Sequence, residues 1–133
     1  MGYLLKHAQL LFLQLTSAEL EPTGISPQQW AALNCMDEQY GCSQREVAEL
    51  LGVDRTTMVA LVDQLQTKGW VTRHPQPGDR RKNAVSLTDE GRDILRGGAR
   101  LIDDCERRFL APLSELDARQ LKNALRTLIA ASR

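Results

Sequence analysis

The feature that most constrains this fold is a pair of helix starts separated by one short turn. Ser43 precedes Glu46 by three positions, and Gly52 and Val53 stand directly before Asp54. Ser and Asp are favoured N-cap residues, a Glu three positions after a Ser completes a capping box, and Gly commonly ends a helix. The sequence therefore predicts two short helices joined by a tight glycine-containing turn, which is the helix-turn-helix pattern.

The second of these helices has one apolar face. Its apolar residues recur at positions i, i+3, i+4 and i+7, namely Met58, Leu61, Val62 and Leu65. This spacing places them on one side of an α-helix, and we expect that side to be buried. Lys68 and Gly69 predict where this helix ends.

The flanking segments also show helix starts. Ser26, Pro27 and Gln29 form another capping box, and Thr88 and Asp117 are the expected N-caps of the last two helices. The predicted helices cover residues 4–20, 27–39, 43–51, 54–68 and 88–110, with a last helix from 117 onward. Between the helices, the sequence predicts two short strands, at Trp70–His74 and Asn83–Leu87. It predicts an exposed loop at residues 75–82, which are rich in Pro, Gly and charged residues.

In the hairpin region, Asp79-Arg80-Arg81 is followed at a fixed spacing by the segment VSLTDEGR from Val85 to Arg92. With these residues as the most specific part of the match, the sequence from Val47 to Arg92 resembles the MarR family of transcriptional regulators. The resemblance implies a mainly α fold with a small β-hairpin wing, in which a winged helix-turn-helix is flanked by dimerisation helices. We expect one domain over residues 1–133, with a DNA-binding part at 27–92 and dimerisation helices at 3–20 and 93–133.

The second helix of the helix-turn-helix is expected to enter the major groove of DNA. Its face opposite the apolar stripe carries the candidate contacts Arg55, Thr56, Thr57 and Gln64. Arg and Gln suit base edges, and Thr suits a phosphate or a thymine methyl, although the two threonines could serve only the helix cap. Relatives often have a threonine and a basic residue where this chain has Val59 and Ala60, so we expect this helix to make fewer contacts.

The hairpin carries a second set of candidate DNA contacts. In the family a wing arginine enters the minor groove and an acid two residues earlier orients it; Arg81 and Asp79 occupy these positions. The further candidates are Arg73, Arg80 and Lys82. The alternative is a solvated tip, but an exposed ion pair contributes only about 0–1 kcal/mol, so stability is a weak reason for it. The chain has 17 basic and 17 acidic residues, yet DNA responds to local potential, and this segment is mostly basic.

This interpretation predicts two partners, a double-stranded DNA operator and a second copy of the chain. The first helix and the last two carry more apolar residues than a winged-helix core can bury, and a two-fold dimer can read half-sites about 34 Å apart. The alternative is a monomer in which these helices pack on their own domain.

The resemblance also implies a switch. Family members commonly respond to small aromatic or phenolic ligands, in a crevice between the DNA-binding and dimerisation parts, or to cysteine oxidation. The candidate ligand-binding residues are His7, Phe12, Trp30 and Tyr40, although Trp30 also suits the core and His7 a surface. Cys35 reads as a packing residue. Cys42 stands before a helix start, so we expect it to be exposed with a stabilised thiolate.

The sequence therefore predicts a sequence-specific DNA-binding regulator, namely a repressor released by a small aromatic ligand. The alternatives are a redox-sensing regulator and a winged-helix module that binds protein. The chain contains no Ser/His/Asp set, no phosphate-binding Gly-rich loop and no metal-ligand cluster, so we expect no enzyme activity and no cofactor. No apolar run reaches the roughly 20 residues of a membrane helix, and we expect a cytoplasmic protein.

Overall fold

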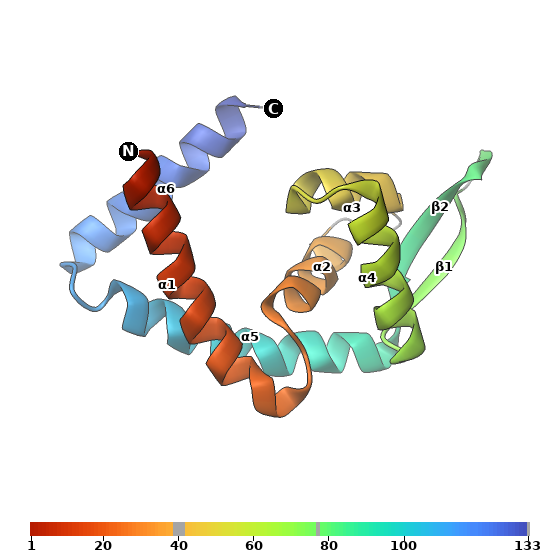
Figure 1. Ribbon diagram of the computed structural model, residues 1–133, viewed down its shortest axis with the longest axis horizontal. Helices are drawn as coiled ribbons and strands as arrows, with labels where there is room; N and C mark the ends of the chain where they lie inside the picture. The colour runs from red at the N-terminus through yellow and green to blue at the C-terminus, as the bar shows by residue number, and fades with distance from the viewer. Residues whose placement is uncertain (39–41, 77, 133) are drawn as a thin grey trace.

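The computed structural model describes residues 1–38, 42–76 and 78–132 (Figure 1). Six α-helices, one short 3-10 helix and a two-stranded hairpin occur in this part of the chain. The helices are α1 (Gly2–Leu20), η1 (Glu21–Thr23), α2 (Pro27–Glu38), α3 (Gln44–Leu51), α4 (Arg55–Thr67), α5 (Asp89–Leu110) and α6 (Glu115–Ala131). The strands are β1 (Val71–Gln76) and β2 (Asp79–Leu87), which pair antiparallel.

The elements form two groups joined by α5. Figure 1 shows α2, α3, α4 and the hairpin gathered at one end of α5, and we call this group the reading head. At the other end lie α1, α6 and both chain termini, which together with the second half of α5 we call the arm. Every helix in the described residues is too short or too polar to cross a lipid bilayer.

The caps that predicted the helices are formed as expected. The Ser26 hydroxyl accepts from the Gln29 N–H at 3.1 Å, and the Gln29 side chain accepts from the Ser26 N–H at 3.0 Å. The Ser43 hydroxyl accepts from the Glu46 N–H at 3.1 Å, so the predicted N-cap is formed, but the Glu46 carboxylate accepts from this hydroxyl at 3.1 Å instead of from the Ser43 backbone N–H. Gly52 has a φ of 68° and ends α3 in the left-handed region that favours glycine. The helix-turn-helix prediction is confirmed.

Three local predictions were wrong or incomplete. The cap of α6 is Ser114, which accepts from the Asp117 N–H at 3.1 Å, so Asp117 is the third helical residue instead of the cap. Residues 75–82 are not all loop, because β1 continues to Gln76 and β2 begins at Asp79. The strands extend because antiparallel pairing needs only backbone groups, and a two-stranded ribbon tolerates polar residues on its solvated side. The 3-10 helix η1 was not predicted.

The core lies in the reading head and continues along α5. It includes the expected stripe of α4, from Met58 to Leu65, together with apolar residues of α2, α3 and the hairpin. The largest fully buried side chains are Leu20, Leu33, Met36, Met58, Leu65, Val47, Val62, Val71, Val85, Thr16 and Cys105. Burial of one side of α4 leaves its other side facing solvent, which positions the candidate site.

The start of α5 is packed tightly against the start of the hairpin. The Thr88 hydroxyl caps α5 by accepting from the Gly91 N–H at 3.0 Å and donates to the Gly69 carbonyl at 2.7 Å. The Trp70 carbonyl accepts from the Thr88 N–H at 3.0 Å. A Cβ at Gly91 would overlap this same carbonyl oxygen, so the position requires a glycine. The Leu-Thr-x-x-Gly pattern is therefore a cap followed by a close backbone approach.

We expect Gly91→Ala to lower the free energy of unfolding by about 1–3 kcal/mol, because the methyl group would have to displace backbone atoms. Gly97→Ala is the matched control on the same helix, since nothing lies within 4 Å of a Cβ at that exposed position. It should raise stability by about 0.5–1 kcal/mol through helix propensity. Urea unfolding at one fixed protein concentration measures both, and equal values for the two variants would contradict the packing argument.

Candidate nucleic-acid interface

The first turn of α4 is an exposed part of the candidate recognition helix. The Asp54 carboxylate caps it by accepting from the Thr57 N–H at 2.7 Å. Hydrogen bonds from the Thr57 backbone and side chain lower the pKa of the Asp54 carboxyl, so the cap is ionised at neutral pH. Arg55, Thr56 and Thr57 are all exposed here. The structure thus brings three of the predicted DNA contacts together at one helix end.

Arg73 holds the hairpin against the two helices of the helix-turn-helix. Its Nη1 donates to the Asp63 carboxylate at 2.5 Å and to Gln66 Oε1 at 3.0 Å. Its Nη2 donates to the Val59 carbonyl at 3.3 Å, and its Nε donates to Gln44 Oε1 at 3.2 Å. A guanidinium has five N–H donors, and these bonds engage four of them. We call this set the Arg73 clamp; it leaves little of the guanidinium for a phosphate.

Gln64 lies on the second half of α4 and faces the start of α2. Its Oε1 accepts from Gln29 Nε2 at 3.3 Å. One turn further on, Lys68 Nζ donates to the Gly24 carbonyl at 2.6 Å and lies 4.6 Å from the centroid of the Trp70 ring. Gln64 is exposed but is separated along the helix from the first turn, so the structure does not place it with Arg55.

The wing residues Asp79, Arg80, Arg81 and Lys82 lie in β2. Pairing with β1 brings Asp79 opposite Gln76, with a shift of register between Pro75 and Gln76. The side chains of these four residues lie outside the described part of the structure, so their DNA contacts stay predictions. Figure 1 shows the hairpin projecting beyond the rest of the reading head, beside α4.

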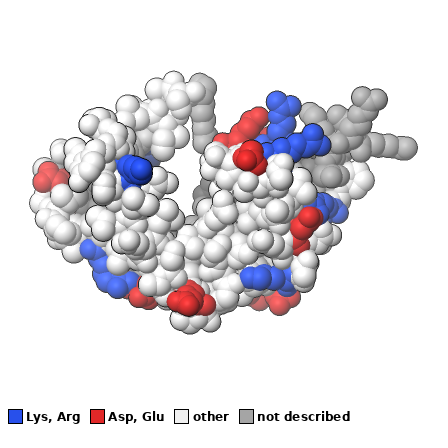
Figure 2. Space-filling view, in the orientation of Figure 1, with Lys and Arg blue, Asp and Glu red and all other residues white. Residues whose placement is uncertain are grey.

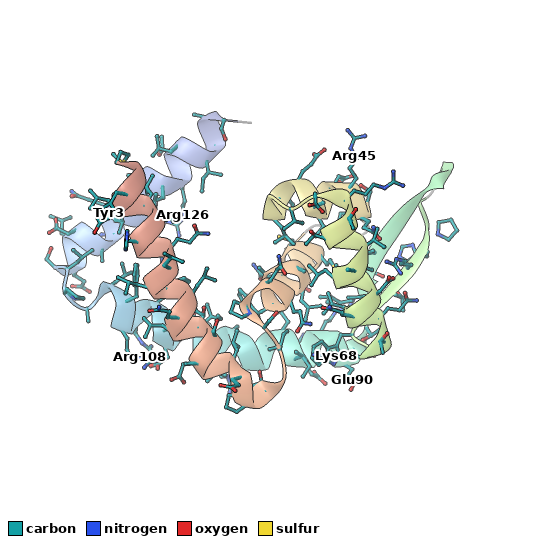
Figure 3. All side chains as sticks on the ribbon, in the orientation of Figure 1. Tyr3, Arg45, Lys68, Glu90, Arg108 and Arg126 are labelled. Atoms are coloured by element: carbon teal, nitrogen blue, oxygen red, sulfur yellow. The ribbon has the colours of Figure 1, made fainter. Side chains whose placement is uncertain are left out.

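Arg45 is an exposed cation that the sequence analysis missed. Figure 3 shows it on α3, pointing away from α5 on the side where α4 begins. Its side chain is 85% exposed, and within the described residues its ion-pair partner is Glu49, at 3.3 Å on the same helix. Figure 2 shows basic and acidic side chains next to each other at this end of the molecule. Its position two residues after the Ser43 cap was the available signal, since this places a cation at the edge of the helix-turn-helix.

Known proteins share this architecture and sequence pattern. A model of the MarR family matches residues 23–82. The transcriptional repressor MprA of Escherichia coli is 27% identical over 125 residues, which are 92% of this chain and 71% of MprA. A probable transcriptional regulator from Pseudomonas aeruginosa is 31% identical, with a TM-score of 0.86 over 96% of each chain.

The chain belongs to the MarR family. Its members are transcriptional regulators, so the predicted family, winged-helix fold and regulatory class are confirmed, and the chain is a regulator and not an enzyme. Two further solved structures that are similar to this chain contain bound molecules. A mutant of E. coli MarR complexed with operator DNA is 26% identical, with a TM-score of 0.86 over 96% of this chain and 91% of that one. CouR from Rhodococcus jostii RHA1 bound to p-coumaroyl-CoA is 30% identical, with a TM-score of 0.84 over 96% and 90%.

In this MarR-family chain the predicted ligand-binding residues that the structure describes each contact a different group. The centroid of the His7 ring lies 4.2 Å from that of Tyr3, with the two rings tilted by 39°, and the Phe12 ring meets Phe109 edge-on at 5.3 Å. His7 and Phe12 are five residues apart on α1, which places them about 140° apart around the helix axis. Trp30 Nε1 donates to the Leu95 carbonyl at 3.1 Å, and Tyr40 lies outside the described residues. A hollow of about 350 Å³ elsewhere is lined by Leu110, Glu115, Ala118, Arg119, Lys122 and Arg126.

The expectation for Cys42 was wrong. Its side chain is only 5% exposed, because the backbone beside it pairs with β2, where the Val85 N–H donates to the Cys42 carbonyl at 3.0 Å. Burial raises the pKa of the Cys42 thiol, and the neighbouring Glu46 carboxylate raises it further. Cys35 is partly buried against the core and Cys105 is fully buried. The thiol of Cys42 is therefore protonated at neutral pH, the opposite of a stabilised thiolate.

We expect Arg73→Lys to destabilise the reading head by about 1–2 kcal/mol, because an ammonium cannot make the four divergent bonds of the guanidinium. Arg45→Lys is the matched control, since it retains one exposed charge and should change stability by less than about 0.5 kcal/mol. Thermal unfolding followed by circular dichroism distinguishes them. The clamp has no structural role if the two variants melt together.

We expect iodoacetamide at pH 7 to modify Cys42 more slowly than Cys35 in the folded protein, because the thiolate is the reactive form and burial limits access. In urea the two rates should converge. Peptide mass spectrometry at several times gives both rates. Equal labelling of Cys42 in folded and unfolded protein would mean that the thiol is open to reagents and would return a redox role to consideration.

Proposed function

We propose that this MarR-family regulator binds a pseudo-palindromic double-stranded operator as a homodimer. We further propose that it represses transcription until a small aromatic ligand releases it. The observation that carries the proposal is that the first turn of α4 is exposed while the opposite face of the same helix is buried in the core. A recognition helix needs this arrangement, because base edges can be read only by side chains that its own domain leaves free.

Arg55 is the residue best suited to read a base in the major groove, because its exposed guanidinium can donate two bonds to a guanine edge. Thr56 and Thr57 would contact phosphates or a thymine methyl. Asp79 and Arg81 would act in the minor groove, where enhanced negative potential attracts a guanidinium, with Arg80 and Lys82 on phosphates. Arg73 would act mainly as a positioning residue that fixes the angle between α4 and the wing. The operator complex of the E. coli MarR mutant supports operator DNA as the partner.

The arm supports the homodimer. The structure describes no buried residue in α6, and α1 has only Thr16 and Leu20 buried. The large apolar side chains exposed on these two helices are Tyr3, Leu4, Leu5, Leu10, Leu11, Leu13, Leu116, Leu121, Leu125, Leu128 and Ile129. An apolar surface of this extent at the end opposite the reading head fits a second copy of the chain, since isologous dimers pair identical apolar patches.

An effector with an aromatic group is supported by the complex of CouR with p-coumaroyl-CoA, a thioester that carries a phenolic ring. His7, Phe12, Trp30 and Tyr40 remain the candidate contacts in this chain. The exposed imidazole of His7 and the partly buried ring of Phe12 lie on the arm, whereas Trp30 lies on the reading head. A ligand that bridges the two groups would change DNA affinity by altering the angle between them.

We expect tight, salt-sensitive binding to a few pseudo-palindromic fragments when the protein is titrated against intergenic DNA of its source genome. Fluorescence anisotropy at two salt concentrations measures it. Arg55→Ala should cost about 1–3 kcal/mol and relax base preference. Arg81→Ala should weaken binding about tenfold, equivalent to about 1.4 kcal/mol, and reduce the salt slope by about 1.

Arg107→Ala is the matched control for these variants. It removes the same charge from an exposed arginine of α5 whose recorded contact is Asp104 at 3.2 Å. Its affinity should equal that of the unmodified protein, and the mass of the complex on a full operator should correspond to two chains. Binding no tighter than to random DNA, or an Arg81→Ala variant identical to the control, would reject the proposal and favour a protein partner for this surface.

A further inference from the structure

The reading head and the arm meet at a contact between a tryptophan and a glycine. Trp30, on α2, places its indole against α5 and donates from Nε1 to the Leu95 carbonyl at 3.1 Å. A Cβ at Gly98 would lie 2.5 Å from Trp30 Cδ1 and 2.7 Å from Trp30 Nε1. The same Cβ would lie 3.6 Å from Leu20 Cδ2, at the end of α1. The absence of a side chain at Gly98 therefore allows the indole to pack directly on the α5 backbone, at the point where α5 leaves the reading head.

On either side of this contact α5 is held by different groups. Before it, Gly91 packs on the Trp70 carbonyl of the reading head, and Leu95 is part of the core. Beyond it, Cys105 Sγ lies 3.6 Å from the Leu15 carbonyl of α1, and Arg108 pairs with Glu19 at 3.0 Å. The Trp30–Gly98 contact thus stands between the part of α5 fixed to the head and the part fixed to the arm.

We propose that the Trp30–Gly98 contact sets the distance between the two recognition helices of the dimer, and with it the half-site spacing that the regulator accepts. This inference rests on the proposed function. Neither residue would touch DNA; both would act as positioning residues through α2 and α5. The contact is suited to fixing this distance because the indole is rigid and its one hydrogen-bond donor is satisfied. Gly98 has no side chain that could change its rotamer to absorb a movement of the indole.

The length of α5 makes a small change at this contact large at the DNA. From Gly98 to Leu110 the helix runs 12 residues, or about 18 Å at 1.5 Å per residue. With Leu110 held in the arm, a rotation of about 5° over that length moves each of the two heads by about 1.6 Å, so the distance between the heads changes by about 3 Å. Ten to 10.5 base pairs span about 34–36 Å, so this displacement corresponds to about one base pair. A single methyl group could therefore alter the preferred spacing without altering any base contact.

The test uses two neighbouring glycines. Gly98→Ala places a methyl group where the Trp30 indole packs, and Gly97→Ala adds the same methyl group where nothing lies within 4 Å. The probes are versions of the tightest intergenic fragment with half-site centres moved apart or together in steps of one base pair. We expect Gly97→Ala to keep the original spacing profile. Gly98→Ala should lose about tenfold affinity for the original spacing and shift its optimum by about one base pair.

Trp30→Phe keeps the test decisive if Gly98→Ala does not fold, because it leaves an aromatic ring on α2 and removes the N–H that binds Leu95. It should broaden the spacing profile while leaving the salt slope unchanged, since no phosphate contact is altered. Folded, dimeric variants of both residues with the original profile would overturn the inference.

A DNA-free measurement separates this inference from the proposed function. Small-angle X-ray scattering of the free dimers should give a changed pair-distance distribution for Gly98→Ala and an unchanged one for Gly97→Ala. If the unmodified protein binds no operator, the proposed function fails, and the scattering still decides whether this contact sets the distance between heads. Identical scattering for the two glycine variants would overturn the positioning role.

Discussion

The exposed turn of α4 can act as a reading element only while α4 and the hairpin keep one relative orientation, and the Arg73 guanidinium provides this constraint. It joins the first residue of α3, the middle of α4 and strand β1 in one set of hydrogen bonds. The Asp63 side chain is 58% exposed, so its charge pairing alone would contribute little. The stabilisation comes from several divergent bonds made by one planar group, which only arginine can supply.

This use of Arg73 has an electrostatic consequence. Because Arg73 pairs with Asp63 of the same chain, it contributes less to the potential at the DNA surface, and Arg45 is opposed in the same way by Glu49. A chain of zero formal net charge then depends on its remaining cations for its attraction to DNA. The proposed contacts at Arg55 and in the wing are therefore expected to carry most of the salt dependence, because phosphate neutralisation scales with the number of cations that reach the backbone.

The predictions that succeeded concern local signals. Ser26, Ser43, Asp54 and Thr88 each bond a backbone N–H three residues ahead, so their role is visible in a short stretch of sequence. The prediction of Asp117 as a cap was wrong although the same rule identifies the true cap, because Ser114 stands three residues before Asp117 and accepts from its N–H. Cys42 failed for another reason: its burial depends on pairing with β2, about 40 residues away, which no local pattern reveals. Arg73 bonds residues of α3 and α4, and Trp30 bonds Leu95 of α5. The sequence could identify these two residues as candidates, but the groups that they contact belong to other elements and follow from the packing of the fold.

One face of α5 explains how the two groups act as a unit. Its buried residues are Gly91, Leu95, Gly98 and Cys105, which are spaced by four, three and seven positions. This spacing keeps them on one side of the helix, since seven residues complete nearly two turns. Along that side the helix meets first the hairpin, then the indole of α2, and then α1. Two of the four positions are glycines because the neighbour there is a carbonyl or an indole edge that approaches the helix backbone directly. A rigid helix with such close contacts transmits a change at one neighbour to the others, because none of them can move without displacing α5.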